Sequence, residues 1–156
     1  MYDIFQKTLS KNVSIAGIGL HSGKPSKITL LPAKEDQGIV FKRVDLKQDN
    51  LIIAKFENVT SAKLCTTLEN EFGIKVSTVE HLLAALYISD IDNVIIEIDN
   101  EEVPIMDGSA KNFLDVINKV NLKTQNKKRK FLKISKKVEL SDGSRKISIE
   151  PSDNLE

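Results

Sequence analysis

Apolar and polar residues alternate over the first two-thirds of the chain in a way that predicts short β-strands. Ile28 and Leu30 share one face of residues 26–32, and a second run follows at 38–44. Alternation over roughly four to eight residues is typical of half-buried strands. We expect further strands at residues 13–15, 62–68, 74–76 and 93–99.

The apolar period changes at Ser77, where an α-helix is predicted to begin. Its apolar stripe, at the helical spacing i, i+3, i+4 and i+7, consists of Val79, Leu82, Leu83 and Leu86. Ser77 followed by Glu80 fits a capping box, in which both side chains bond to backbone N–H groups at the helix start. His81 falls on the opposite side beside Ala84 and Ala85, so we expect leucines toward the sheet and a close-approaching partner on the alanine side.

A second helix is expected after a loop at residues 101–108. Ser109 is its predicted cap, and its inward side chains are Phe113, Leu114, Ile117 and Val120. Further strands are predicted at 131–134, 138–140 and 145–149, with a hairpin turn at Asp142 and Gly143. An isolated two-stranded hairpin is marginal in water, so this segment needs another element to cover it.

Length and charge narrow the class of protein. The chain has 156 residues, a formal net charge of +1 and one cysteine. An intramolecular disulfide is therefore excluded, and a reducing compartment, the cytoplasm, is expected. No apolar run approaches the roughly 18 residues of a membrane span, and the near-neutral charge gives no general attraction to nucleic acid.

Residues 123–137 contain eight basic and no acidic side chains. The segment lacks the interleaved aromatic residues that stack on bases, so a solvated linker is favoured over a nucleic-acid contact. An RNA-contacting domain stays an alternative, for which strong and salt-dependent RNA retention would be the sign.

The adjacent Glu80 and His81 are the main candidates for chemistry. An imidazole can ligate zinc, and a neighbouring carboxylate that does not bind the metal can take a proton from water. The alternative assigns Glu80 to the capping box and His81 to the surface, and one carboxylate cannot fill both roles. Catalytic zinc usually takes three protein ligands, and no histidine follows His81.

The other candidates are single residues. His21 lies in the glycine-broken turn 17–23 and is either a second ligand or a solvated histidine. Cys65 has no histidine or basic residue directly beside it, so it is predicted to be a small apolar side chain rather than a nucleophile. Asp107 is explained by the turn that it forms with Gly108.

Five motifs together resemble one enzyme family, in the same order and at the same spacing. They are GIGLHSG at 17–23, LCT at 64–66, STVEHL at 77–82, IDN at 91–93 and VPIMDGSA at 103–110. The family is that of the UDP-3-O-acyl-N-acetylglucosamine deacetylases, the zinc amidases of lipid A biosynthesis in Gram-negative bacteria. The resemblance extends over essentially the whole chain and concerns the N-terminal half of the family.

This resemblance implies a fold and a reaction. The fold is of the α+β class, a sheet with two helices packed on one face, and two such domains hold their helices between the two sheets. By position in the motif, Glu80 would be the general base and His81 one of three zinc ligands. The residues that would border the substrate are His21, Leu64, Cys65 and Thr66. Water on zinc would attack the acetamide carbonyl of UDP-3-O-acyl-N-acetylglucosamine and release acetate.

The chain also departs from the family pattern. Members are normally twice as long, and their second half supplies the other two zinc ligands as a His-x-x-x-Asp pair. We therefore expect a first domain over residues 1–122, a basic linker over 123–130 and the first hairpin of a truncated second domain over 131–156. The chain by itself is expected neither to bind zinc tightly nor to deacetylate.

Two further interpretations stay open. In the first, the chain is one piece of a split enzyme and docks a separate second half on the alanine side of the first helix. In the second, it is a non-catalytic binding module that kept the fold. A pure binding module has no chemical need for a carboxylate beside a ligand-type histidine. The pair of Glu80 and His81 therefore favours the enzyme half.

Overall fold

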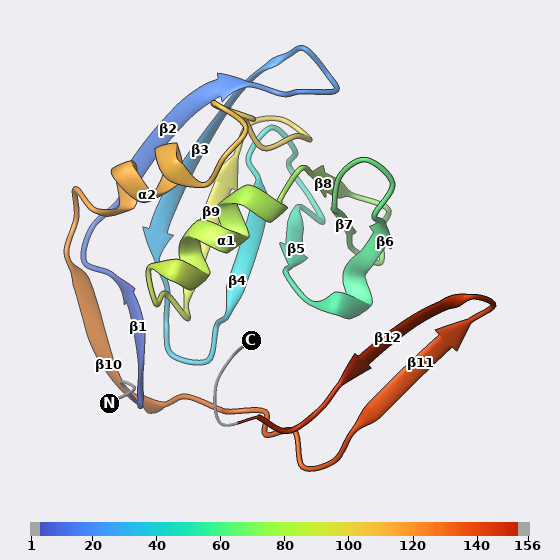
Figure 1. Cartoon of the computed structure of the whole chain (residues 1–156). Helices are drawn as coiled ribbons and strands as arrows, with labels where there is room; N and C mark the ends of the chain where they lie inside the picture. The colour runs from blue at the N-terminus through green and yellow to red at the C-terminus, as the bar shows by residue number, and fades with distance from the viewer. Residues whose placement is uncertain (1–3, 153–156) are drawn as a thin grey trace.

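The computed structural model describes residues 4–152, which form an α+β fold around a five-stranded sheet (Figure 1). The strands of this sheet are β2 (Val13–Ile18), β3 (Pro25–Pro32), β4 (Ile39–Arg43), β5 (Leu51–Ile53) and β9 (Val94–Ile98). Their order is β2-β3-β9-β4-β5, and all neighbours are antiparallel except β4 and β9. The strands predicted at 13–15, 26–32, 38–44 and 93–99 are confirmed.

Two helices, α1 (Glu80–Ile88) and α2 (Lys111–Ile117), cover one face of this sheet (Figure 1). Alternate residues of β3 and β9 are buried beneath them, as a strand period of two requires. The completely or almost completely buried side chains include Ile28, Leu30, Ile96 and Ile98 from the sheet and Leu82, Leu86, Phe113 and Ile117 from the helices. The predicted fold class, a sheet with two helices on one face, is confirmed.

The apolar side of α1 is wider than predicted. Ala85 is completely buried, although it was predicted to lie on the open side of the helix. It follows Leu82 by three residues and therefore shares its face, where a small side chain lets the helix lie close to the sheet. The exposed side is formed instead by Ala84, Tyr87 and Ile88.

The second helix starts two residues after its predicted cap. The Ser109 hydroxyl accepts a hydrogen bond from the Lys111 N–H at 3.1 Å. Phe113 and Ile117 point inward as predicted. The loop predicted at 101–108 is also confirmed, since it contains no regular helix or strand.

A three-stranded sheet of β6 (Val59–Ser61), β7 (Thr67–Glu69) and β8 (Lys75–Ser77) follows a short 3₁₀ helix, η1 (Phe56–Asn58). The strand predicted at 62–68 is wrong over most of its length, because residues 62–66 form a loop. Leu64 has a φ of +69°, which a strand does not allow.

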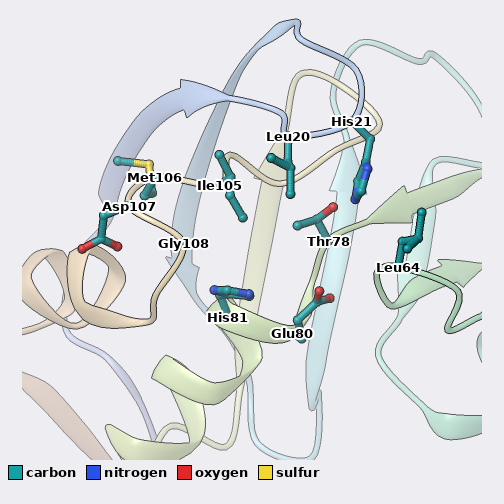
Figure 2. A pocket seen from close by; sticks show the side chains of 10 residues that line it. All are labelled: Leu20, His21, Leu64, Thr78, Glu80, His81, Ile105, Met106, Asp107 and Gly108. Carbon is teal, nitrogen blue, oxygen red and sulfur yellow. The ribbon is translucent and has the colours of Figure 1, made fainter.

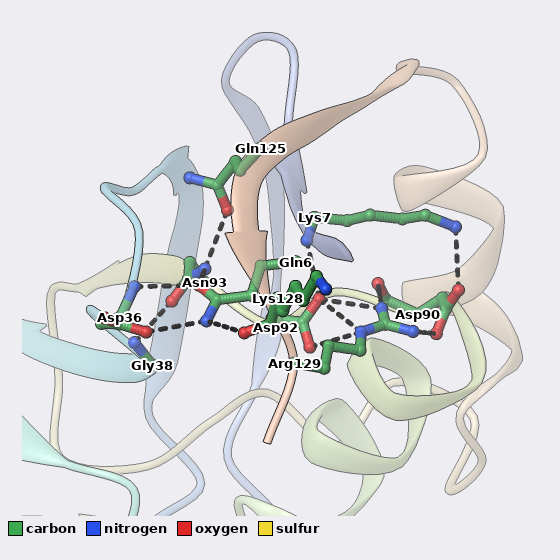
Figure 3. Close-up of polar contacts among 10 residues, drawn as sticks. All are labelled: Gln6, Lys7, Asp36, Gly38, Asp90, Asp92, Asn93, Gln125, Lys128 and Arg129. Carbon is green, nitrogen blue, oxygen red and sulfur yellow. Dashed lines mark hydrogen bonds and ion pairs between the residues drawn. The ribbon is translucent and has the colours of Figure 1, made fainter. Parts of the chain in front are cut away.

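Strand β10 (Leu122–Lys128) pairs antiparallel with β1 (Phe5–Leu9), where the sequence analysis predicted a solvated linker. Hydrogen bonds and ion pairs with residues far away in the sequence hold this polar segment in place (Figure 3). The Gln125 carbonyl accepts a hydrogen bond from the Asn93 amide at 2.8 Å, and Arg129 binds Asp90 at 2.6 Å and Asp92 at 2.8 Å.

The last two strands, β11 (Val138–Asp142) and β12 (Arg145–Ile149), form the predicted hairpin, whose residues are exposed throughout. Figure 1 shows it extending away from the main sheet. The strand predicted at 131–134 is wrong, since this stretch is irregular. Within residues 4–152 no helix is long and apolar enough to cross a membrane.

Candidate active site

Glu80 and His81 stand in the first turn of α1, and the predicted capping box is wrong. Ser77 ends β8, and its hydroxyl donates to the Glu101 carbonyl at 3.3 Å instead of capping the helix. Glu80 is the first helical residue, and its Oε2 accepts a hydrogen bond from the Thr66 N–H at 3.0 Å. The carboxylate therefore binds the 62–66 loop and does not cap its own helix.

An open cavity of about 510 Å³ lies above the start of α1 (Figure 2). Its lining residues are Leu20, His21, Leu64, Thr78, Glu80, His81, Ile105, Met106, Asp107 and Gly108. In Figure 2 the side chains of Glu80 and His81 rise from the helix on one side, and His21 lies across the cavity beside Thr78. Two histidines and two carboxylates, those of Glu80 and Asp107, thus share one solvent-accessible space.

Besides the start of α1, three segments bring these side chains together. His21 lies in the turn between β2 and β3, and its N–H donates to the Glu102 carboxylate at 2.9 Å. Leu64 comes from the 62–66 loop and is 85% exposed. The 103–108 loop supplies the apolar wall with Ile105 and Met106.

Two of the residues predicted to border the substrate do not line the cavity. Thr66 instead contacts Glu80 through its backbone N–H, at 3.0 Å from the Glu80 Oε2. Cys65 is half-buried, and its Sγ is 3.9 Å from the Thr67 hydroxyl. The roles assigned to His21, Leu64, Cys65 and Thr66 stay predictions.

Thr78, Glu102 and the apolar 103–108 loop had no predicted role in the site. Thr78 is buried and adopts a φ of +57°, a conformation that no local sequence pattern indicates for a β-branched residue. The 103–110 motif was the available signal for the loop. Asp107 forms the expected turn, since its Oδ1 accepts bonds from the Ser109 N–H at 3.0 Å and hydroxyl at 2.8 Å, which lower its pKa.

Metal-binding side chains are sparse around this cavity. In the described part of the chain, no three His, Cys, Asp or Glu side chains come close enough together to hold a metal ion. His81 is one of the two imidazoles that line the cavity, and it stands beside the Glu80 carboxylate in the first turn of α1. His81 therefore offers one donor of the kind that zinc takes, next to Glu80 as a possible base.

Comparison with known proteins places the chain in a family. Residues 6–156 match the family model of UDP-3-O-acyl N-acetylglycosamine deacetylase. A UDP-3-O-acyl-N-acetylglucosamine deacetylase from Wigglesworthia glossinidia brevipalpis is 44% identical over 153 residues, which are 97% of this chain and 51% of the relative. The enzyme of the same name from Geotalea uraniireducens is 47% identical over 148 residues, 95% of this chain and 48% of the relative.

A third relative of that name, from Shewanella baltica, is 43% identical over 148 residues, 95% of this chain and 48% of the relative. The chain thus spans about half the length of the curated relatives that it matches. The family match covers nearly all of this chain and includes every cavity-lining residue. This chain therefore belongs to the UDP-3-O-acyl N-acetylglycosamine deacetylase family.

Proposed function

We propose that this chain supplies one half of the active site of a deacetylase that hydrolyses the acetamide of UDP-3-O-acyl-N-acetylglucosamine and releases acetate. The observation that carries the proposal is the meeting of His21, Glu80 and His81 in one cavity of a member of this family. Hydrolysis of an amide requires an activated water molecule, and an imidazole beside a carboxylate is suited to that task.

Glu80 is the proposed general base. It is half-buried at the start of α1, with its Oε2 held by the Thr66 N–H. Its Oε1 has no hydrogen-bond partner among the described residues, so this oxygen is available to take a proton from water in the cavity. A well-placed base of this kind contributes about 10²- to 10⁴-fold to a rate.

His81 is the proposed metal ligand, and its imidazole fits one of the ligand positions of a zinc site. When bound, zinc lowers the pKa of water and polarises a substrate carbonyl. His81 would hold the ion, and Glu80 would stay beside it as a carboxylate that does not ligate. Because catalytic zinc takes three protein ligands, we propose that the other two come from the part of the family length that this chain does not span.

The substrate-binding role divides among the four predicted residues. His21 and Leu64 line the cavity and are proposed to contact substrate directly. Thr66 is proposed to act through its backbone N–H, which orients Glu80. Cys65 lies next to this contact and is proposed to support the loop.

We propose a domain organisation that follows the family. A first domain covers residues 1–122, a basic connection covers 123–130, and 131–156 begin a second domain that operates with the first in the cytoplasm. The pairing of β10 with β1 ties the connection to the first domain. The exposed side of α1, with Ala84, Tyr87 and Ile88, is the proposed docking side for the second half.

A deacetylation assay with zinc tests these proposals. We compare the 156-residue chain alone with a fusion in which the C-terminal half of the Geotalea uraniireducens relative follows it. We expect acetate release from the fusion and none from the chain alone. In the fusion, Glu80→Gln is expected to lower kcat by about 10²- to 10⁴-fold.

Glu71→Gln is the matched control, because Glu71 is an exposed carboxylate in the turn between β7 and β8. It should keep the activity of the fusion. Turnover by the zinc-loaded chain alone would contradict the need for a second half, and full activity of Glu80→Gln would exclude Glu80 as the base. Substrate binding without turnover by the fusion would favour a non-catalytic module.

A further inference from the structure

Glu102 is a buried carboxylate that the proposed chemistry does not use. It is 2% exposed, yet no Lys or Arg pairs with it in any described contact. Its Oε1 accepts hydrogen bonds from the His21 N–H at 2.9 Å and the Thr78 hydroxyl at 3.0 Å, and its Oε2 accepts the Ser22 N–H at 2.8 Å. A buried charge needs such compensation, because its removal from water is costly.

The balance of these effects keeps Glu102 ionised. Burial alone would raise its pKa, but the hydrogen bonds from His21, Ser22 and Thr78 outweigh burial and lower the pKa to about 2. These amide and hydroxyl donors all bind the same carboxylate, so all of them would lose their hydrogen-bond partner if the Glu102 side chain moved away. The charged carboxylate therefore holds the His21 and Ser22 N–H groups and the Thr78 hydroxyl in place.

The Glu102 carboxylate joins two segments that are far apart in the sequence. On one side is the turn that carries His21, and on the other is Thr78, two residues before Glu80. Thr78 has a φ of +57°, a strained conformation for a β-branched residue that persists only where its surroundings enforce it. Backbone contacts reinforce the junction, since the Val103 N–H donates to the Ser77 carbonyl at 3.1 Å.

The turn is shaped to accept the carboxylate. A Cβ atom built on Gly19 would overlap the Ser22 hydroxyl and the Glu102 carboxylate, so a side chain at this position would push the turn away from Glu102. Gly19 is itself buried, and its N–H donates to the Lys24 carbonyl at 2.9 Å. The close approach of the turn to Glu102 thus depends on a residue without a side chain.

We propose that Glu102 is a positioning residue that locks the His21 turn to the start of α1, so that His21, Glu80 and His81 face the same cavity. This role rests on the proposed function, because it is the deacetylase site that is positioned. Glu102 does not line the cavity and acts through Thr78 and the turn.

The first test needs no activity and uses amide proton–nitrogen NMR spectra of the 156-residue chain. Glu102→Gln keeps the shape but turns one acceptor oxygen into a donor. We expect it to shift the amide signals of His21 and Ser22 together with those of Glu80 and His81. The control Glu101→Gln, an exposed neighbouring carboxylate, should shift neither set. Unchanged Glu80 and His81 signals in Glu102→Gln would overturn the proposal.

A milder pair of variants decides the question if Glu102→Gln does not fold. Thr78→Val removes one donor to the carboxylate and keeps the side-chain shape, whereas Thr78→Ser restores the hydroxyl. We expect Thr78→Val to shift the His21 and Ser22 amide signals through Glu102, and Thr78→Ser to bring them back toward their wild-type positions. Wild-type His21 and Ser22 signals in Thr78→Val would show that the carboxylate does not couple the two segments.

Kinetics of the fusion separate positioning from mere stability. Glu102→Gln is expected to lower kcat by about 10- to 100-fold, because small displacements of reacting groups have effects of this size. KM should change by less than about threefold, as for an interaction that acts on the chemical step. Normal kcat in a folded but less stable variant would overturn the proposal. If wild type and Glu101→Gln also fail to turn over, the proposed function fails, and the NMR result alone decides the role of Glu102.

Discussion

Glu80 is a residue for which sequence left two incompatible roles. As a capping-box partner it would bond to its own helix, and as a base it must face the cavity. The structure separates these roles, because the helix begins at Glu80 itself and Thr66 holds the carboxylate from outside. A residue three positions after a serine fits a capping box only when the serine is the N-cap, and here Ser77 belongs to a strand.

Glu102 yields a prediction for stability against acid. Its pKa in the folded chain is about 2, below the ordinary 4.5. A carboxyl with a lowered folded pKa contributes stability that is present above the unfolded pKa and lost as the pH falls toward the folded one. The free energy of unfolding should therefore fall less steeply between about pH 4.5 and pH 2 in Glu102→Gln than in the wild type.

Urea unfolding at a series of pH values measures this difference. The lowered pKa values of Asp36, Asp45 and Asp90 contribute equally to both proteins and cancel in the comparison. Glu101→Gln serves as the control and should keep the wild-type slope. If the free energy of unfolding depends on pH in the same way in Glu102→Gln and wild type, the hydrogen bonds do not stabilise the charged form of Glu102.

At the scale of elements, a cluster of polar side chains explains why β10 is a strand (Figure 3). Asn93 is 1% exposed and joins three segments: its Nδ2 donates to Gln6 and Gln125, and its Oδ1 accepts the Gly38 N–H, each at 2.8 Å. A lysine-rich segment has little apolar surface of its own to bury. Its strand conformation therefore depends on these partners and on β1.

Replacement of Asn93 by alanine should destabilise the fold by about 3 kcal/mol, because the buried Gln6 and the half-buried Gly38 and Gln125 lose their partner. Chemical denaturation monitored by circular dichroism measures this loss. Asn126→Ala is the matched control, since Asn126 is exposed in the same strand, and its effect should stay within about 0.5 kcal/mol. Equal stability of the two variants would mean that the cluster does not hold β10.

At the scale of the whole molecule, the chain divides between the packed α+β unit and the exposed hairpin. Residues 129–137 connect β10 to β11 without a helix or strand. The hairpin side chains Val138, Leu140, Ile147 and Ile149 are each more than half exposed. Such surface in water is the kind that another protein segment covers, in line with the proposed second half.

Limited digestion with trypsin should reveal this division. Lys133 and Lys136 lie in the irregular connection, whereas Lys127 lies in β10 and its Nζ is 2.9 Å from Asp36. We expect early cleavage after Lys133 or Lys136, and a resistant fragment that keeps β10, because proteases need locally open backbone. Mass spectrometry identifies the fragments. Early cleavage after Lys127 would contradict the pairing of β10 with β1.

The sequence by itself determined the elements whose pattern is local. The alternation in residues 26–32 and 93–99 predicted two central strands, and the leucine spacing after Ser77 predicted α1. The five motifs indicated the family through residue identity and spacing alone. These features are readable because burial of one face imposes a period of two on a strand and of about 3.6 on a helix.

Only the tertiary structure decided the features that depend on distant partners. It placed β10 against β1, buried Ala85 beside Leu82, and gave the Glu80 carboxylate to Thr66. It also brought His21 and Glu102 together across 81 residues. The physical reason is that a hydrogen bond or a packing contact between remote segments leaves no periodic trace in the sequence, although it sets which side chains share a cavity.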